Sequence, residues 1–258
     1  MYLDDILAHH RALAKEDHRD ADLLISSARA MPPTRGFRRA IVESSKHLLA
    51  VIAEIKRRSP SKGDLNIDLD PAQLARDYED AGATCLSVLT DEEYFGGSRS
   101  DLEIARRSST LPVIRKDFIV SVGDVCDSRL MGADCILLIA SALTPAEMIL
   151  FFATAVDIGL DVLVEVHNAD ELERSVELGA TLIGVNQRNL ATFEVDHTRA
   201  RQLVPLFPSG VVKVAESGVR NGEDARVLRD CGFDAVLVGE SLLTSENISA
   251  SLQELQVK

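Results

Sequence analysis

Short apolar runs alternate with longer amphipathic stretches from residue 48 to near the end of the chain. The runs are rich in Val, Ile and Leu, whereas the stretches between them carry apolar residues at helical spacing. We therefore predict eight strands, near residues 49–55, 85–89, 112–116, 134–139, 161–166, 181–186, 211–215 and 234–238. Each interval has room for the helix and loops of a parallel crossover. The pattern favours an α/β fold, a closed (β/α)8 TIM barrel, over an open doubly wound sheet.

A short motif recurs before every second predicted strand. Gly82, Gly132, Gly179 and Gly232 each stand shortly before an apolar run, at nearly equal spacing along the chain. A glycine there can end the preceding helix in the left-handed conformation before the chain turns into the strand. One such motif could be an ordinary turn, but four at regular spacing support a barrel of eight units.

The first 47 residues have a different pattern. Apolar residues such as Leu3, Ile6 and Leu13 fall at helical intervals among many charged residues, until Pro32 and Pro33 interrupt the pattern. We expect residues 1–47 to form an N-terminal helical extension. It should pack on a catalytic barrel of residues 48–258, within a single domain overall.

Composition narrows the class of protein. The chain has 28 Lys and Arg against 41 Asp and Glu, a formal net charge of −13, with 46% hydrophobic residues. This acidic balance argues against a broad basic surface for nucleic acid or an anionic membrane, so any phosphate site must be local. The four cysteines form no C-x-x-C pair, no signal-peptide pattern opens the chain, and no apolar run is long enough to span a bilayer. We expect a cytoplasmic protein without nucleic-acid or membrane partners.

Charged and polar residues close several predicted strands. The carboxyl ends of barrel strands converge on the reactive face, so these residues are the candidates for catalysis. They are Glu54, Lys56, Lys116, Glu165, Asn186 and Glu216. Glu54 and Lys56 are two apart on one strand and share a face, where a carboxylate can keep a partly buried ammonium charged; a purely structural ion pair is the alternative. Lys116 and Glu165 come from two other strands and can act as acid and base on one substrate.

Small residues after the last two predicted strands indicate a phosphate site. The candidates are Ser217, Gly218, Gly239 and Glu240, whose backbone N–H groups can approach an anion. Arg188, after the sixth strand, can add a guanidinium suited to bidentate contact. The side chain of Glu240 suits this cradle only if it points away, because an inward carboxylate repels an anion. Ser59 opens the segment 59–63, which is either a loop that closes over the substrate or an ordinary Pro/Gly turn.

Metal and cofactor chemistry has little support in the chain. His167 follows a strand end two residues after Glu165, but no second His or Cys stands at ligand spacing. The other histidines fall in predicted helices or loops. Neither a G-x-G-x-x-G fingerprint nor a Walker loop occurs. We expect chemistry by side chains alone, with no metal and no cofactor.

The motifs at the strand ends form a series. VIAEIKRRSPSKG stands at 51–63, and RKDF at 115–118, LVEV at 163–166, GVNQRNL at 184–190 and AESG at 215–218 follow it. This series, from about Pro32 to Leu243, closely resembles the indole-3-glycerol-phosphate synthase family. The resemblance implies a monomeric barrel enzyme that closes the small phosphorylated substrate 1-(2-carboxyphenylamino)-1-deoxyribulose 5-phosphate into an indole. Carbon dioxide and water are lost, and no metal or cofactor takes part.

The resemblance also implies a role for each candidate. Lys116 matches the acid that protonates the ketone oxygen as the anthranilate ring carbon attacks, and Glu165 matches the group that assists dehydration. Lys56 matches a lysine near the substrate's carboxylate and phosphate, and its step is open. The residues that match orienting groups are Glu54, Asn186 and Glu216. The matches to the phosphate site are Ser59, Arg188, Ser217, Gly218, Gly239 and the N–H of Glu240.

Three further points come from the residues themselves. The flat ring of the substrate needs an apolar wall, and Phe118 and Leu137 are our candidates for it. The segment 120–125 departs from the family's pattern, which leaves the start of the third barrel helix open. Gly36 stands where the family often has an acidic residue, which leaves open how the N-terminal segment covers the mouth of the barrel. One alternative is another phosphate-binding barrel, such as a phosphoribosylanthranilate isomerase or a sugar-phosphate epimerase, which would need a Cys/Asp pair or metal-binding histidines at the strand ends. The other is a noncatalytic barrel, which would be expected to have lost a lysine or a carboxylate.

Overall fold

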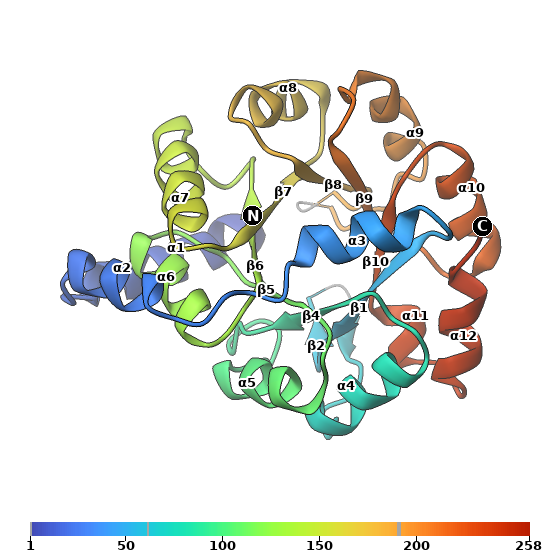
Figure 1. Cartoon of the computed structure of the whole chain (residues 1–258), viewed down its shortest axis with the longest axis horizontal. Coiled ribbons are helices and arrows are strands. Elements are labelled where there is room, and N and C mark those ends of the chain that lie inside the picture. Colours follow the sequence, from blue (N-terminus) through green and yellow to red (C-terminus); the bar gives the residue numbers. More distant parts are fainter. Residues whose placement is uncertain (1, 61, 190–191) are drawn as a thin grey trace.

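Eight parallel strands close into a barrel in this computed structural model, which describes residues 2–60, 62–189 and 192–258 (Figure 1). The strands follow one another in chain order around the barrel, and the last pairs with the first. They are β1 (Ala50–Ile55), β4 (Cys85–Leu89), β5 (Val113–Lys116), β6 (Cys135–Ile139), β7 (Asp161–Val166), β8 (Leu182–Asn186), β9 (Val212–Glu216) and β10 (Ala235–Val238). The predicted (β/α)8 fold is confirmed, and every predicted strand end lies within one residue of the observed one.

Helices between the strands form the outer layer of the barrel (Figure 1). They are α4 (Pro71–Asp80), α5 (Arg99–Ser108), α6 (Val122–Leu130), α7 (Pro145–Asp157), α8 (Ala169–Glu177), α9 (Arg199–Leu203), a 3₁₀ turn η1 (Val204–Leu206), α10 (Gly222–Asp230), α11 (Glu240–Leu243) and α12 (Ile248–Leu255). The side chain of Ser121 accepts a hydrogen bond from the N–H of Asp124 and caps α6, so the atypical segment 120–125 contains an ordinary helix start. Within the described residues, none of the helices has the length and apolar character needed to cross a membrane.

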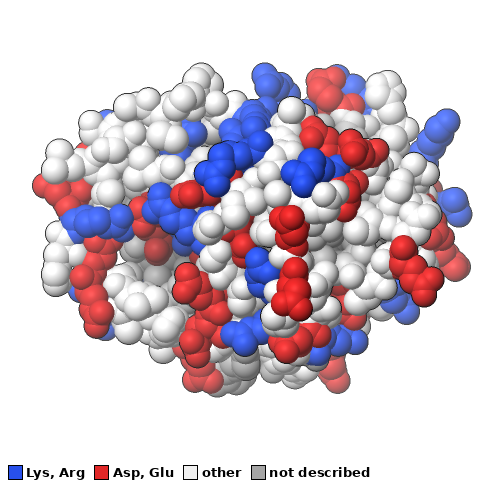
Figure 2. Space-filling view, turned by 90° about the horizontal axis from the view of Figure 1, so that it is seen from below, with Lys and Arg blue, Asp and Glu red and all other residues white. Residues whose placement is uncertain are grey.

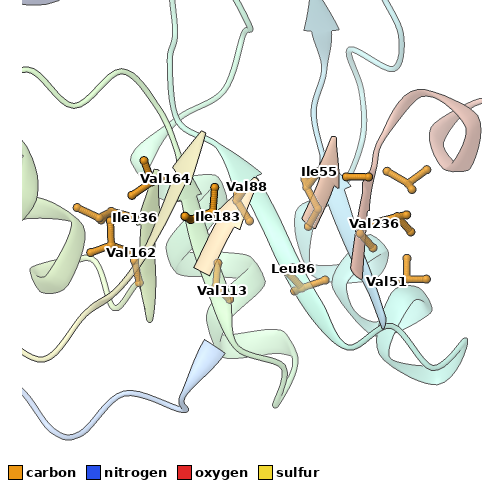
Figure 3. Close-up of a cluster of buried hydrophobic side chains, with 14 of the residues drawn as sticks. Val51, Ile55, Leu86, Val88, Val113, Ile136, Val162, Val164, Ile183 and Val236 are labelled. Atoms are coloured by element: carbon orange, nitrogen blue, oxygen red, sulfur yellow. The ribbon is translucent and has the colours of Figure 1, made fainter. Parts of the chain in front are cut away.

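Alternation along the strands produces two apolar layers, because successive side chains point to opposite faces. One layer lies between strands and helices, and Figure 3 shows part of it around Val51, Leu86 and Val236. The other fills the barrel interior, where Ile52, Cys85, Ile114, Cys135 and Leu163 meet. The interior layer supports the floor on which the strand-end residues stand.

The recurring glycines end helices as predicted. Gly82, Gly132, Gly179 and Gly232 have φ of 90°, 92°, 90° and 96°, in the left-handed region that a side chain disfavours. Each stands just after a helix, at α4, α6, α8 and α10 respectively, and just before the next strand. The internal repeat is therefore a repeated helix-to-strand turn.

Three helices precede the barrel. They are α1 (Tyr2–Glu16), α2 (Ala21–Arg29) and α3 (Phe37–Ser45). α3 covers the amino ends of the strands, where Phe37 and Ile41 are fully buried against the interior layer. α2 packs on α6, and α1 reaches the opposite, carboxyl end. The predicted helical character of the N-terminal extension is confirmed. The helical pattern was expected to end at Pro32 and Pro33, whereas α3 begins beyond them, after Gly36.

Charges of both signs are spread over the surface. On the face in Figure 2, Lys and Arg side chains are interspersed with Asp and Glu side chains. No broad basic area gathers on that face, in keeping with the excess of acidic residues in the chain.

Candidate active site

A cavity of about 700 Å³ opens at the carboxyl ends of the strands. Every residue that the sequence suggested as a site residue lines it, although they are far apart in the chain. They are Glu54, Lys56, Ser59, Lys116, Phe118, Leu137, Glu165, Asn186, Arg188, Glu216, Ser217, Gly218, Gly239 and Glu240. The barrel brings them together, because all eight carboxyl strand ends meet at one face. Their individual roles stay predictions.

An ammonium group lies between two buried carboxylates at the floor of this cavity. Lys116 Nζ is 3.9 Å from Oε2 of Glu165 and 3.9 Å from Oε2 of Glu216. Burial lowers the pKa of Lys116, but the charges of Glu165, Glu216 and Glu54 outweigh burial and raise the pKa above its usual value. At 3.9 Å the contacts are ion pairs without a close hydrogen bond. The ammonium is held charged and can donate to a ligand.

Glu216 carries an unusual carboxyl group. Burial, reinforced by the neighbouring Glu165, raises the pKa of Glu216 well above its usual value. Among the described residues, neither oxygen of Glu216 has a hydrogen-bond partner, and Oε1 of Glu165 has only a long contact of 3.4 Å with Nε2 of His167. Buried polar atoms are nearly always hydrogen-bonded in folded proteins. These oxygens are therefore available for hydrogen bonds with a ligand.

Glu54 and Lys56 form the inward-facing pair that their spacing predicted. Lys56 Nζ donates a hydrogen bond to Glu54. Burial raises the pKa of Glu54, but Lys56 and Lys116 outweigh burial and leave the pKa below its usual value. A Cβ at Gly239 would overlap the Glu54 carboxylate, and one at Gly184 would overlap that of Glu216. Glycine at these two positions leaves the space that the carboxylates fill.

Polar groups gather on one side of the cavity. Ser217 and Gly218 have φ of 65° and 78°, so two successive residues adopt the left-handed conformation in the turn after β9. Arg188 donates to the backbone oxygen of Phe193 over 3.0 Å, and its own N–H donates to Oδ1 of Asn186 over 2.9 Å. These bonds hold the Arg188 side chain on the cavity wall, beside the turn, in a position suited to an anion.

Glu240 is paired with a lysine at the rim. Its carboxylate lies 3.3 Å from Nζ of Lys62, and both side chains are exposed. The carboxylate is thus partly neutralised, while the backbone of Glu240 begins α11 beside Gly239. Lys62 belongs to the segment 59–63, where β2 (Arg58–Ser59) pairs with β3 (Gly63–Asp64) in a short antiparallel hairpin. Ser61 lies outside the described residues, and closure of this segment over a substrate stays a prediction.

The opposite side of the cavity is aromatic and apolar. Phe118 and Leu137, the predicted ring wall, both line it. Phe95 lies beside Phe118, with ring centroids 6.2 Å apart. Leu3 and Ile6 of α1 complete this side. The helical extension therefore contributes to the cavity, whereas its apolar spacing alone predicted only helices that pack on the barrel.

Two histidines lie close to the site, His167 where its place after a strand end allows and His10 where no histidine was expected. Nε2 of His167 is 3.4 Å from Oε1 of Glu165, and Nε2 of His10 is 2.8 Å from Oδ2 of Asp91 just outside the aromatic wall. Leu3, Ile6 and His10 stand at i, i+3 and i+7, and this helical stripe was the signal that could have found His10.

His10, Asp91 and Asp117 form the one group in the described part of the chain whose ligand atoms, within 4.8 Å of one another, could hold a metal ion. Oxygens of both aspartates already accept hydrogen bonds, from the guanidinium of Arg115 and from backbone N–H groups. The group has the arrangement of a histidine–carboxylate ion-pair network rather than of an open metal centre.

Comparisons with known proteins agree with this geometry. A model of the family "Indole-3-glycerol phosphate synthase" matches residues 3–255. Relatives of that name include one from Chlorobium phaeovibrioides, 47% identical over 86% of this chain and 85% of its own, and one from Bordetella pertussis, 43% identical over 97% and 95%. Among solved structures, a thiamine phosphate pyrophosphorylase from Pyrococcus furiosus has a TM-score of 0.60 at 16% identity, over 82% of this chain and 95% of its own, which shows the fold alone. The chain belongs to the indole-3-glycerol phosphate synthase family, whose members are carboxy-lyases.

Proposed function

We propose that this protein converts 1-(2-carboxyphenylamino)-1-deoxyribulose 5-phosphate into indole-3-glycerol phosphate, carbon dioxide and water, by acid–base catalysis with side chains alone. The observation that carries the proposal is the charged Lys116 between Glu165 and Glu216. It lies in a cavity with an anion-binding side and an aromatic side. The substrate has the matching layout: a phosphate at one end, an aromatic ring at the other and a ketone between them.

Binding begins with the two ends of the substrate. The phosphate binds the backbone N–H groups of Ser217, Gly218 and Glu240, with Ser59, Gly239 and the guanidinium of Arg188 beside them. The aromatic ring packs against Phe118 and Leu137. Asn186 orients the substrate hydroxyls between these ends. With both ends held, the ketone and the attacking ring carbon come close enough to react without a further loss of freedom.

Ring closure needs an acid. Lys116 donates its proton to the ketone oxygen while the ring carbon that bears the carboxylate bonds to the ketone carbon. The attack interrupts the aromaticity of the ring and places positive charge on the nitrogen, which Glu165 stabilises. Carbon dioxide then leaves, and the electron pair of its broken bond restores the aromatic ring.

Dehydration completes the indole. The hydroxyl formed from the ketone accepts a proton and leaves as water, and Glu165 removes a proton from the neighbouring CH₂ carbon so that the ring double bond forms. Lys56, held by Glu54, and a reprotonated Lys116 are the two candidate donors. The raised pKa of Glu216 lets its carboxyl group hold a proton next to Lys116 between the two steps.

An absorbance assay of indole formation tests this function. We expect turnover by the unchanged protein, and a loss in kcat/KM of about 10²- to 10⁴-fold or more for Lys116→Ala with the fold retained. Lys46→Ala, an exposed lysine at the end of α3, is the matched control and should keep full activity. Absence of indole with the unchanged protein would refute the function, and near-normal turnover of Lys116→Ala would remove Lys116 from the acid role.

We also propose the setting of the protein. All four cysteines are free thiols and three of them are buried, which supports a reducing, cytoplasmic compartment. α1 lines the cavity and α3 covers the amino ends of the strands, which supports treating residues 1–47 as part of one domain with the barrel. A monomer remains our expectation, testable by sedimentation.

A further inference from the structure

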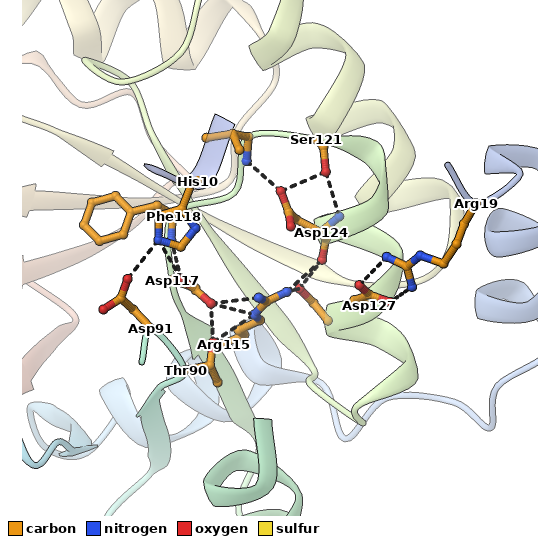
Figure 4. A network of polar contacts seen from close by, with 12 residues as sticks. His10, Arg19, Thr90, Asp91, Arg115, Asp117, Phe118, Ser121, Asp124 and Asp127 are labelled. Atoms are coloured by element: carbon orange, nitrogen blue, oxygen red, sulfur yellow. Dashed lines mark hydrogen bonds and ion pairs between the residues drawn. The ribbon is translucent and has the colours of Figure 1, made fainter. Parts of the chain in front are cut away.

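α1 forms one wall of the aromatic side of the cavity. Leu3 and Ile6 line the cavity, and His10 follows on the same face of the helix. His10 does not line the cavity itself; it stands behind Phe118, with ring centroids 5.5 Å apart (Figure 4). Anything that fixes His10 therefore fixes both the helix and the ring that it touches.

Asp91 holds His10 with a short contact. Nε2 of His10 lies 2.8 Å from Oδ2 of Asp91, and their side chains are 14% and 1% exposed. The other oxygen of Asp91 accepts hydrogen bonds from the N–H groups of Tyr94 and Phe95 over 2.7 and 2.9 Å. One carboxylate thus ties α1 to the turn that presents Phe95 to the cavity.

Asp117 provides a second link. Its Oδ1 lies 3.9 Å from Nε2 of His10 and accepts a hydrogen bond from the N–H of Phe118 over 2.8 Å. Its Oδ2 accepts from the guanidinium of Arg115 over 2.7 Å and from the hydroxyl of Thr90. Figure 4 shows these contacts converging on Asp117, next in the chain to Lys116.

The charges around His10 favour its protonated form. Asp91 and Asp117 face it from the segments after β4 and β5, Asp124 faces it from α6, and Arg115 lies behind Asp117. Burial lowers the pKa of His10, but the hydrogen bond to Asp91 and these carboxylate charges outweigh burial and raise the pKa above its usual value. A charged histidine strengthens both links, because charge-assisted hydrogen bonds are about twice as strong as neutral ones.

We propose that His10 is a positioning residue: its ion pair with Asp91 fastens α1 across the cavity and holds Phe95 and Phe118 in place as the binding wall for the substrate's carboxyphenyl ring. This inference rests on the proposed function for the identity of the ring. His10 contacts the wall from behind, so its loss should weaken ring binding and leave the phosphate side and the acid–base residues unchanged.

Two substitutions isolate this ion pair. His10→Phe keeps a flat ring against Phe118 and removes the charge and the hydrogen bond. Asp91→Asn keeps an oxygen that can accept from the Tyr94 and Phe95 N–H groups, and removes the charge. His18→Gln, in the exposed link between α1 and α2, is the matched control.

The readouts separate the two ends of the cavity. We expect KM for the carboxyphenylamino substrate to rise about tenfold in both variants, the effect of one charge-assisted hydrogen bond. kcat should stay within about threefold, because the ring still packs on Phe118 and Leu137 once it is bound and the acid–base residues are unchanged. The inhibition constant of inorganic phosphate should stay within about twofold, because phosphate binds on the other side of the cavity. In the unchanged protein KM should rise as pH passes above the raised pKa of His10, and this rise should be absent in His10→Phe.

The outcomes decide whether His10 positions the aromatic wall or only stabilises the protein as a whole. An unchanged KM in both variants, or an inhibition constant for phosphate that rises by the same factor as KM, would overturn the proposal. If His10→Phe does not fold, Asp91→Asn decides alone. If the unchanged protein makes no indole, the proposed function fails, and hydrogen exchange of residues 2–16 then decides about the fastening: faster exchange in the two variants than in His18→Gln supports it, and equal exchange refutes it.

Discussion

The two ends of the barrel treat buried charges differently. At the amino end, the fully buried Asp134 accepts hydrogen bonds from the N–H groups of Arg35 and Val113 and from the guanidinium of Arg106. At the carboxyl end, Glu216 is 2% exposed, its oxygens accept no hydrogen bond from the described residues, and Nζ of Lys116 lies 3.9 Å from one of them. A buried carboxyl group with close hydrogen-bond donors supports a fold, whereas one without them costs stability. The amino end therefore holds the barrel together, and the carboxyl end gives up stability to keep groups ready for a substrate.

The largest expected effect is on activity at the carboxyl end. Glu165→Gln keeps the size of the side chain and removes the base, so we expect kcat to fall by about 10²- to 10⁴-fold. Urea unfolding should show little change in stability. Glu177→Gln, an exposed glutamate at the end of α8, is the control. Equal activities of the two variants would contradict the role of Glu165.

The amino end should respond in stability instead. Asp134→Ala leaves the guanidinium of Arg106 and two backbone N–H groups without their acceptor, so we expect a loss of about 3–5 kcal/mol in the free energy of unfolding. Activity per folded molecule should stay the same. Asp157→Ala breaks the exposed pair with Arg29 and should cost at most about 1 kcal/mol. Similar losses of unfolding free energy in the two variants would show that Asp134 does not stabilise the amino end in the way we infer.

Glu216→Gln should lower activity and raise stability. The pKa of Glu216 is raised in the folded protein, so the unfolded chain releases this proton first as pH rises above 4.5, and the folded state loses stability from there upward. Gln does not titrate, so the variant should be more stable at pH 7, by about 1–3 kcal/mol. The difference should vanish below pH 4.5. A variant less stable than the unchanged protein at pH 7 would show that the carboxylate is well satisfied.

The smallest expected effect lies at the rim. Lys62→Met removes the partner of Glu240 and leaves a bare carboxylate beside the phosphate, so KM should rise a few fold at low salt and less at high salt. Stability should change by less than about 0.5 kcal/mol, because the pair is exposed. Adding Glu240→Gln should restore KM. If KM depends neither on salt nor on the residue at position 240, the pair of Lys62 and Glu240 has no part in phosphate binding.

Sequence patterns were sufficient for the barrel because its strands are nearly continuous apolar runs and its helices end at regularly placed glycines. The same regularity located the site, since strand ends such as Lys116 and Glu165 must converge once the barrel closes. Spacing within one strand also predicted the pairing of Glu54 with Lys56.

Contacts between separate elements could not be predicted from the hydrophobic pattern of the sequence. The packing of α1 on the cavity depends on a tertiary contact, so His10 showed only as one more helical histidine. The partner of Glu240 was equally hidden, because Lys62 lies about 180 residues away along the chain and only the folded barrel places it at the same rim. The start of α6 looked irregular in sequence, yet Ser121 is an ordinary cap.

The most direct test is a crystal structure with the alcohol analogue of the substrate, in which the ketone is reduced and cannot cyclise. We expect Lys116 Nζ within about 3.2 Å of the oxygen that replaces the ketone, the phosphate at Ser217 and Gly218, and the ring against Phe118. An analogue bound in the reverse direction, or with that oxygen beyond the reach of Lys116, would contradict the acid role on which the proposed function rests.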